Sequence, residues 1–117
     1  MLKIKQGNTA LLKFYLTDVD GAAIVDLAST TAIKFWIANP VTGAKFVEVL
    51  KASMTLNDPS TGYLKVPLTA VQTVTLVLPR YFFGIQLEYT GKTIEADAYV
   101  DNELTNILVV EKQVVTT

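Results

Sequence analysis

Apolar and polar residues alternate along most of the chain, in short segments separated by turn residues. Because successive side chains of a β-strand point to opposite faces, this period of two predicts strands with one face in a core. The clearest segment is Ala10 to Thr17, in which Leu12, Phe14 and Leu16 share one face. Further strands are predicted at residues 2–5, 32–38, 45–50, 54–56, 63–68, 81–88 and 93–100.

Glycine-containing turns separate several of these strands. Asp18-Val19-Asp20-Gly21 combines short polar side chains with a residue that takes positive φ at no steric cost. Residues 57–62 form a second strong turn signal, and Thr90-Gly91 lies between two alternating segments, which is typical of a β-hairpin. The order of strands and tight turns therefore favours antiparallel pairing.

Two segments are less regular. Residues 68–76 predict a connection with at most one helical turn, because threonine and valine disfavour longer helices. In the tail, residues 104–115, the apolar segment Ile107 to Val110 suits a strand buried on both faces, whereas Leu104, Ile107 and Leu108 also fit helical spacing. We favour the strand.

The predicted elements belong to the all-β class. About seven to eight short strands with regular turns and no long helix predict an immunoglobulin-like antiparallel β-sandwich. We expect residues 1–117 to form a single domain of this kind. A jelly roll or a small barrel would produce the same alternation, because periodicity reports which face is buried and not how the strands connect.

Composition adds an expectation about assembly. Half of the residues are apolar and only 18% are charged, which is more apolar than an average soluble domain. Burial of surface in an oligomer would explain this excess. The net charge of −1 is not concentrated anywhere, so we expect neither nucleic acid nor an acidic membrane as a partner.

The absence of histidine and cysteine excludes several kinds of catalysis. A Ser-His-Asp triad needs an imidazole base, thiol chemistry needs cysteine, and zinc sites of ordinary affinity need one or both residue types. We therefore expect a protein that is not an enzyme, with no catalytic residues, no cofactor, no metal site and no small-molecule substrate.

Carboxylate groups do not change this expectation. Asp18, Asp20 and Asp26 supply oxygen ligands, but the nearby glycine and the twelfth loop residue do not match an EF-hand, so we interpret them as β-turn residues. The acidic residues of the predicted hairpin are placed by the alternation on a solvated face: Glu88, Glu95 and Asp97.

Outward-facing aromatic and apolar residues are the strongest candidates for function. Alternation places the Trp36 indole outward, where a second sheet, a partner or a stacked ligand would cover it. Sugar stacking would use Trp36 together with tyrosines, as in carbohydrate-binding modules: Tyr15, Tyr63, Tyr81 and Tyr89. The residues that we select as candidate interface positions are Trp36, Val74, Leu76, Leu78, Ile107 and Val109.

A family resemblance makes the functional expectation more specific. The chain contains Lys5-Gln6-Gly7-Asn8-Thr9, then a strand and turn at residues 12–21, then Asp26-Leu27. These are followed by the turn at residues 57–62 and by Gly91-Lys92. In this order they resemble the N-terminal domain of the baseplate upper proteins (BppU-like) of phages that infect Gram-positive bacteria.

The resemblance implies an immunoglobulin-like domain of a virion, in the tail or baseplate, made in the cytoplasm of the bacterial host. It implies an adaptor that holds receptor-binding proteins through oligomeric contacts and performs no catalysis. The partners expected are other virion proteins or further copies of the chain, as a homo-oligomer. The alternative is an extracellular β-sandwich module that binds carbohydrate or another surface.

Overall fold

The computed structural model describes residues 2–58 and 62–112, without the side chains of residues 46, 57 and 58. Every strand expected from the alternation is present, with bounds that differ by no more than two residues. The strands are β1 (Leu2–Lys5), β2 (Ala10–Thr17), β3 (Ala32–Ala38), β4 (Lys45–Leu50), β5 (Thr55–Asp58), β6 (Tyr63–Leu68), β7 (Arg80–Tyr89), β8 (Lys92–Val100), β9 (Glu103–Leu104) and β10 (Ile107–Glu111). The helices are the short α1 (Ala70–Val74) and two 3₁₀ turns, η1 (Leu27–Ser29) and η2 (Lys51–Ser53).

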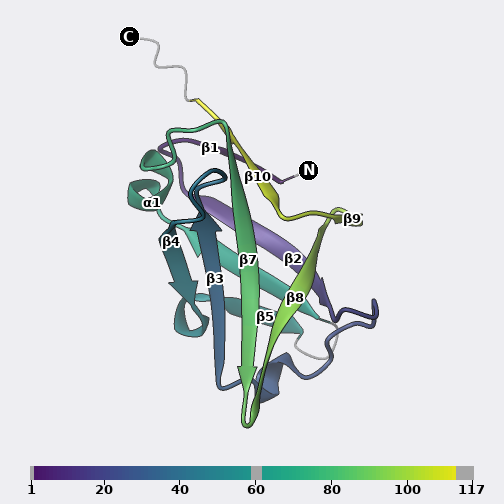
Figure 1. Cartoon of the computed structure of the whole chain (residues 1–117). Coiled ribbons are helices and arrows are strands. Elements are labelled where there is room, and N and C mark those ends of the chain that lie inside the picture. Colours follow the sequence, from purple (N-terminus) through teal and green to yellow (C-terminus); the bar gives the residue numbers. More distant parts are fainter. Residues whose placement is uncertain (1, 59–61, 113–117) are drawn as a thin grey trace.

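The strands form two layers, as Figure 1 shows. In the β3 layer, β3 pairs with β4 on one side and β7 on the other, and the far edge of β7 is shared by β8 and β10. In the β2 layer, β2 pairs with β6, and β6 pairs with β5. These pairings form a two-layer sandwich, which confirms the expected all-β sandwich class.

Strand β8 joins the two layers. Its first half pairs with β7, while Asp97, Ala98 and Tyr99 pair with β2. The chain then reverses through Asp101 and Asn102, which have positive φ angles of 50° and 65°, and β9 pairs back onto β8. No glycine marks this reversal, so β9 has no counterpart among the strands expected from the sequence.

The C-terminal segment is a strand, as favoured, and its residues 113–115 lie outside the described part. Strand β10 pairs antiparallel with β7 and parallel with β1. The sandwich is therefore mixed at this edge and antiparallel in its other pairings.

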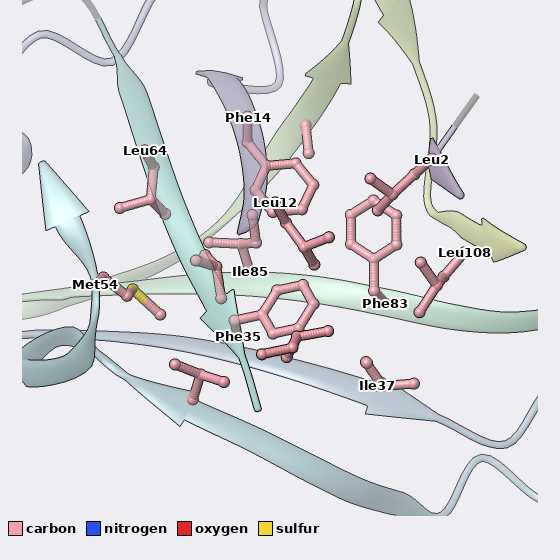
Figure 2. Packing of buried hydrophobic residues seen from close by; sticks show 14 of the residues in the cluster. Leu2, Leu12, Phe14, Phe35, Ile37, Met54, Leu64, Phe83, Ile85 and Leu108 are labelled. Atoms are coloured by element: carbon pink, nitrogen blue, oxygen red, sulfur yellow. The ribbon is translucent and has the colours of Figure 1, made fainter. Parts of the chain in front are cut away.

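The core lies between the layers and is centred on three phenylalanines, which Figure 2 shows together. The ring centroid of Phe14 lies 5.8 Å from that of Phe35 and 5.2 Å from that of Phe83. The inward faces predicted from alternation are confirmed, because each of the following residues is buried: Leu12, Phe14, Leu16, Ile33, Phe35, Ile37, Leu64, Val66, Leu68, Phe83, Ile85 and Leu87.

The connection from β6 to β7 contains the one α-helix of the described residues, in agreement with the single turn expected. Its Thr69 and Gln72 form a capping box, in which each side chain accepts a hydrogen bond from the other's backbone N–H. Thr73 ties α1 to the turn after β1, since its hydroxyl donates to the Asn8 carbonyl at 2.7 Å. None of the helices described here is long and apolar enough to cross a membrane.

Candidate interaction surfaces

Trp36 lies on the outward face of the β3 layer and is covered in part by its own sheet. It pairs with Gly84 of β7, and its indole lies so close to that glycine that a Cβ at position 84 would be 2.3 Å from Cζ2. The ammonium of Lys45 lies 4.2 Å from the ring centroid. The cover expected from a second sheet, a partner or a ligand is thus provided by a neighbouring strand and a lysine.

A group of apolar residues lies beside Trp36 on the same face, and we call it the Phe82 patch. Phe82 of β7 is 43% exposed and pairs with Ala38 on one side and Ile107 on the other. Val109 follows on β10, two residues from Ile107. The Phe82 patch consists of Trp36, Ala38, Phe82, Ile107 and Val109.

The candidates Ile107 and Val109 are each half-buried, whereas Leu108 and Val110 of the same strand are buried in the core. Burial of β10 on both faces is therefore incomplete within this chain. Lys3 and Arg80 lie opposite Val109 on the two neighbouring strands. The apolar patch thus has basic residues along one side.

The segment between α1 and β7 differs from the expectation. Leu76 is 1% exposed and belongs to the core, so it is not an interface residue. Leu76 lies in the turn that follows α1, where its N–H donates to the Thr73 carbonyl at 3.1 Å, and its side chain packs in the core. Val74 is 53% and Leu78 is 36% exposed, so these two candidates remain on the surface and are not buried on either face of a strand.

The β2 layer carries a row of three tyrosines on its outward face. Tyr15 of β2 lies directly opposite Tyr63 of β6 and Tyr99 of β8. The Tyr15 ring centroid lies 5.3 Å from that of Tyr63 and 6.2 Å from that of Tyr99. Tyr63 is the most open of the three, at 52% exposure. We call these residues the tyrosine row.

The other two candidate tyrosines have structural contacts. Tyr81 is in the core, and its hydroxyl accepts a hydrogen bond from the Leu78 N–H at 2.8 Å, which is the tyrosine corner typical of immunoglobulin-like domains. The Tyr89 hydroxyl donates to Asp26 Oδ1 at 2.8 Å. Burial, followed by this hydrogen bond and the Asp26 charge, raises the pKa of Tyr89 to about 12.

Among the acidic residues near the first turn, Asp18 has the expected turn role, whereas Asp26 has a different one. The Asp18 carboxylate accepts hydrogen bonds from the backbone N–H groups of Asp20 and Ala22, so it closes a β-turn. Asp26 is bonded to Tyr89. Over the described residues, no group of three or more histidine, cysteine, aspartate or glutamate side chains has the arrangement of a metal site.

Sequence reasoning missed Phe82 and the role of Tyr99. Alternation with Phe83, Ile85 and Leu87 places Phe82 outward, but nothing in the sequence distinguishes it as an interface residue among three consecutive aromatics. The position of Tyr99 beside Tyr15 follows from the pairing of β8 with β2, which the sequence does not show.

Comparison of the chain with protein-family models finds no match, and comparison with curated proteins finds none either.

Proposed function

We propose that the chain is a non-enzymatic structural module of a phage or prophage virion, a baseplate or tail adaptor domain that acts by protein–protein assembly. The resemblance of its turn segments to baseplate upper proteins supports the virion part of this proposal. The Phe82 patch supports the assembly part.

The observation that carries the proposal is the exposure of Phe82 within the apolar Phe82 patch. The outward face of an antiparallel sheet is ordinarily polar when it meets water. Here Phe82 is 43% exposed, and half-buried Ile107 lies opposite it on β10. Trp36 lies on β3, two residues from Ala38, the residue that pairs with Phe82. Phenylalanine, tryptophan and arginine are enriched at the centres of protein interfaces.

The charges around the patch indicate the character of the partner. Lys3 and Arg80 flank Val109, and Lys45 lies over the Trp36 ring. Acidic residues lie beside them, because Glu111 forms an ion pair with Lys3 at 3.8 Å and Glu48 pairs with Trp36. Opposite charges across an interface speed association and set its register. The partner surface, on another virion protein or on a further copy of this chain, is therefore expected to be apolar at its centre and to carry charges of both signs at its rim.

The assembly is tested by measuring the solution mass of the purified chain by light scattering at several concentrations. We expect a discrete oligomer that survives dilution, and dissociation in Phe82→Glu. Val19→Glu is the matched control, because Val19 is 83% exposed in the first turn and lies outside the patch. An unchanged oligomer in Phe82→Glu would contradict the assignment of the patch.

The virion assignment is tested separately by mass spectrometry of particles purified from lysates of the strain that encodes the chain. We expect the chain to co-purify with tail proteins at a fixed stoichiometry. Its absence from particles, together with a monomeric mass at every concentration, would overturn the proposal.

A further inference from the structure

The tyrosine row continues into a second row of polar side chains on the same face of the β2 layer. Lys13 of β2 pairs with Lys65 of β6. This pair lies next to the pair of Tyr15 and Tyr63, two residues along each strand. Two residues after Tyr99, just beyond the end of β8, lies Asp101, which is followed by Asn102. The two rows surround a hollow of about 430 Å³ that is lined by Lys13, Tyr15, Tyr63, Lys65, Tyr99, Asp101 and Asn102, with Phe14 and Leu64 beneath.

The polar groups of this hollow are available to a ligand. No hydrogen bond or ion pair within the described residues engages the hydroxyls of the tyrosine row, the ammonium groups of Lys13 and Lys65, or the side chains of Asp101 and Asn102. Asp101 and Asn102 are held in the left-handed region, with φ angles of 50° and 65°. Their turn therefore has a defined backbone conformation beside the row.

The chemistry of the two rows selects the kind of ligand. Lysine ammonium groups only donate hydrogen bonds and an ionised aspartate only accepts them, whereas asparagine does both. A hydroxyl group also donates and accepts, so neighbouring hydroxyls on one ring can use both kinds of partner. A phosphate or sulfate would be attracted by Lys13 and Lys65 but repelled by the carboxylate of Asp101. A cation would be repelled by the two lysines.

The geometry of the tyrosines favours a chain of rings over a single flat group. The three phenols lie side by side on three adjacent strands, and their planes are inclined by 56° and 64°. The tyrosine ring centroids are 5.3 Å and 6.2 Å apart. Successive rings of an extended oligosaccharide repeat at a spacing similar to these distances, and each ring is rotated relative to the one before it. Their C–H faces suit the aromatic surface, and their hydroxyls reach the polar row.

We propose that the tyrosine row and the polar row beside it form a binding site for a neutral oligosaccharide, with Tyr63, Tyr15 and Tyr99 stacking on successive sugar rings. The site lies on the β2 layer, whereas the Phe82 patch lies on the β3 layer. The inference therefore does not depend on the proposed assembly. Trp36 takes no part in this site, because its ring is in contact with Gly84 and Lys45.

The test is a titration of the chain with cellohexaose, chitohexaose and a heparin hexasaccharide, followed by amide NMR shifts and calorimetry. We expect one of the neutral hexaoses to bind with micromolar to millimolar affinity and to shift residues 13–15, 63–65 and 99–102. Heparin binding that exceeds the neutral sugars would assign the face to polyanions and overturn the proposal. The absence of binding of both neutral hexaoses at millimolar concentration would also overturn it.

Two variants place the site. Tyr63→Ala should weaken binding about tenfold, which is the effect of losing one aromatic contact. Lys13→Met keeps the length of an exposed side chain and should also weaken binding, so it decides the question if Tyr63→Ala does not fold. Gln86→Ala, on the outward face of the β3 layer opposite Lys34 and Glu95, should bind the sugar as the unmodified chain does. Equal affinity in all of these proteins would contradict the site.

Discussion

The indole of Trp36 lies across Gly84 of the neighbouring strand, in the space that a side chain at position 84 would fill. A Cβ there would come within 2.3 Å of Cζ2 and 2.6 Å of Cε2 of the ring. The absence of a side chain on one strand thus allows an outward-facing tryptophan of the next strand to lie flat on the sheet. This contact makes Trp36 part of the Phe82 patch and keeps it from projecting into solvent.

We expect Gly84→Ala to displace the indole and to destabilise the domain by about 1–3 kcal/mol, the usual cost of forcing a methyl group into a filled space. Trp36 is the single tryptophan of the chain, so its fluorescence reports the displacement directly. The emission should move to longer wavelength as the ring becomes more solvated.

Gln86→Ala is the matched control for this change. Gln86 is two residues along the same strand, on the same face, opposite Lys34 and Glu95. It should leave the tryptophan emission unchanged. An equal spectral shift in both variants would show that the contact with Gly84 does not hold the ring.

The hydrogen bond of the tyrosine corner carries a second prediction. Tyr81→Phe removes the acceptor of the Leu78 N–H and should lower the free energy of unfolding by about 1 kcal/mol, as measured by urea denaturation. Tyr63→Phe is its control, because no hydrogen bond of the Tyr63 hydroxyl occurs among the described residues. Equal stability of the two variants would contradict a role for the corner.

The strands and their inward faces could be predicted because alternation is a local property of the sequence. Leu12, Phe14 and Leu16 are recognised as one face without any knowledge of the rest of the fold, and all three are buried. The same reasoning works for β7, although the outward position of Phe82 is occupied by an aromatic residue where alternation ordinarily has a polar one.

The surfaces could not be predicted in full, because they depend on which strands are neighbours. The tyrosine row requires the register of β2 with both β6 and β8, and the Phe82 patch requires β10 to pair with β7. Leu76 shows a different limit: it is a candidate interface position in the sequence, but in the turn after α1 its side chain is buried in the core.

The Tyr89 hydroxyl predicts a loss of stability in alkaline solution. Its folded-state pKa of about 12 lies above the ordinary value of about 10, so the folded chain holds this proton more tightly than the unfolded chain. The resulting stabilisation is complete below pH about 10 and is lost as the pH rises through about 12.

We therefore expect the free energy of unfolding to fall more steeply with pH in the unmodified chain than in Tyr89→Phe over this range. Tyr63→Phe also removes one phenol and should retain the steep dependence. Urea denaturation at a series of alkaline pH values measures the three slopes. Parallel curves for all three proteins would show that the bond to Asp26 does not perturb Tyr89.

Two buried threonines should respond in opposite directions to the same substitution. Thr17 is 3% exposed and its Oγ1 has no hydrogen-bond partner within the described structure, whereas Thr30 is 5% exposed and its Oγ1 donates to the Leu27 carbonyl at 2.6 Å. A buried hydroxyl without a hydrogen-bond partner has lost its hydrogen bonds to water and has gained none in the folded protein. Thr17→Val removes this cost and should raise the free energy of unfolding by about 1 kcal/mol. Thr30→Val removes a satisfied bond and should lower it by a similar amount. Both changes keep the β-branched shape, so denaturation midpoints that move in the same direction would contradict the assignment of the two hydroxyls.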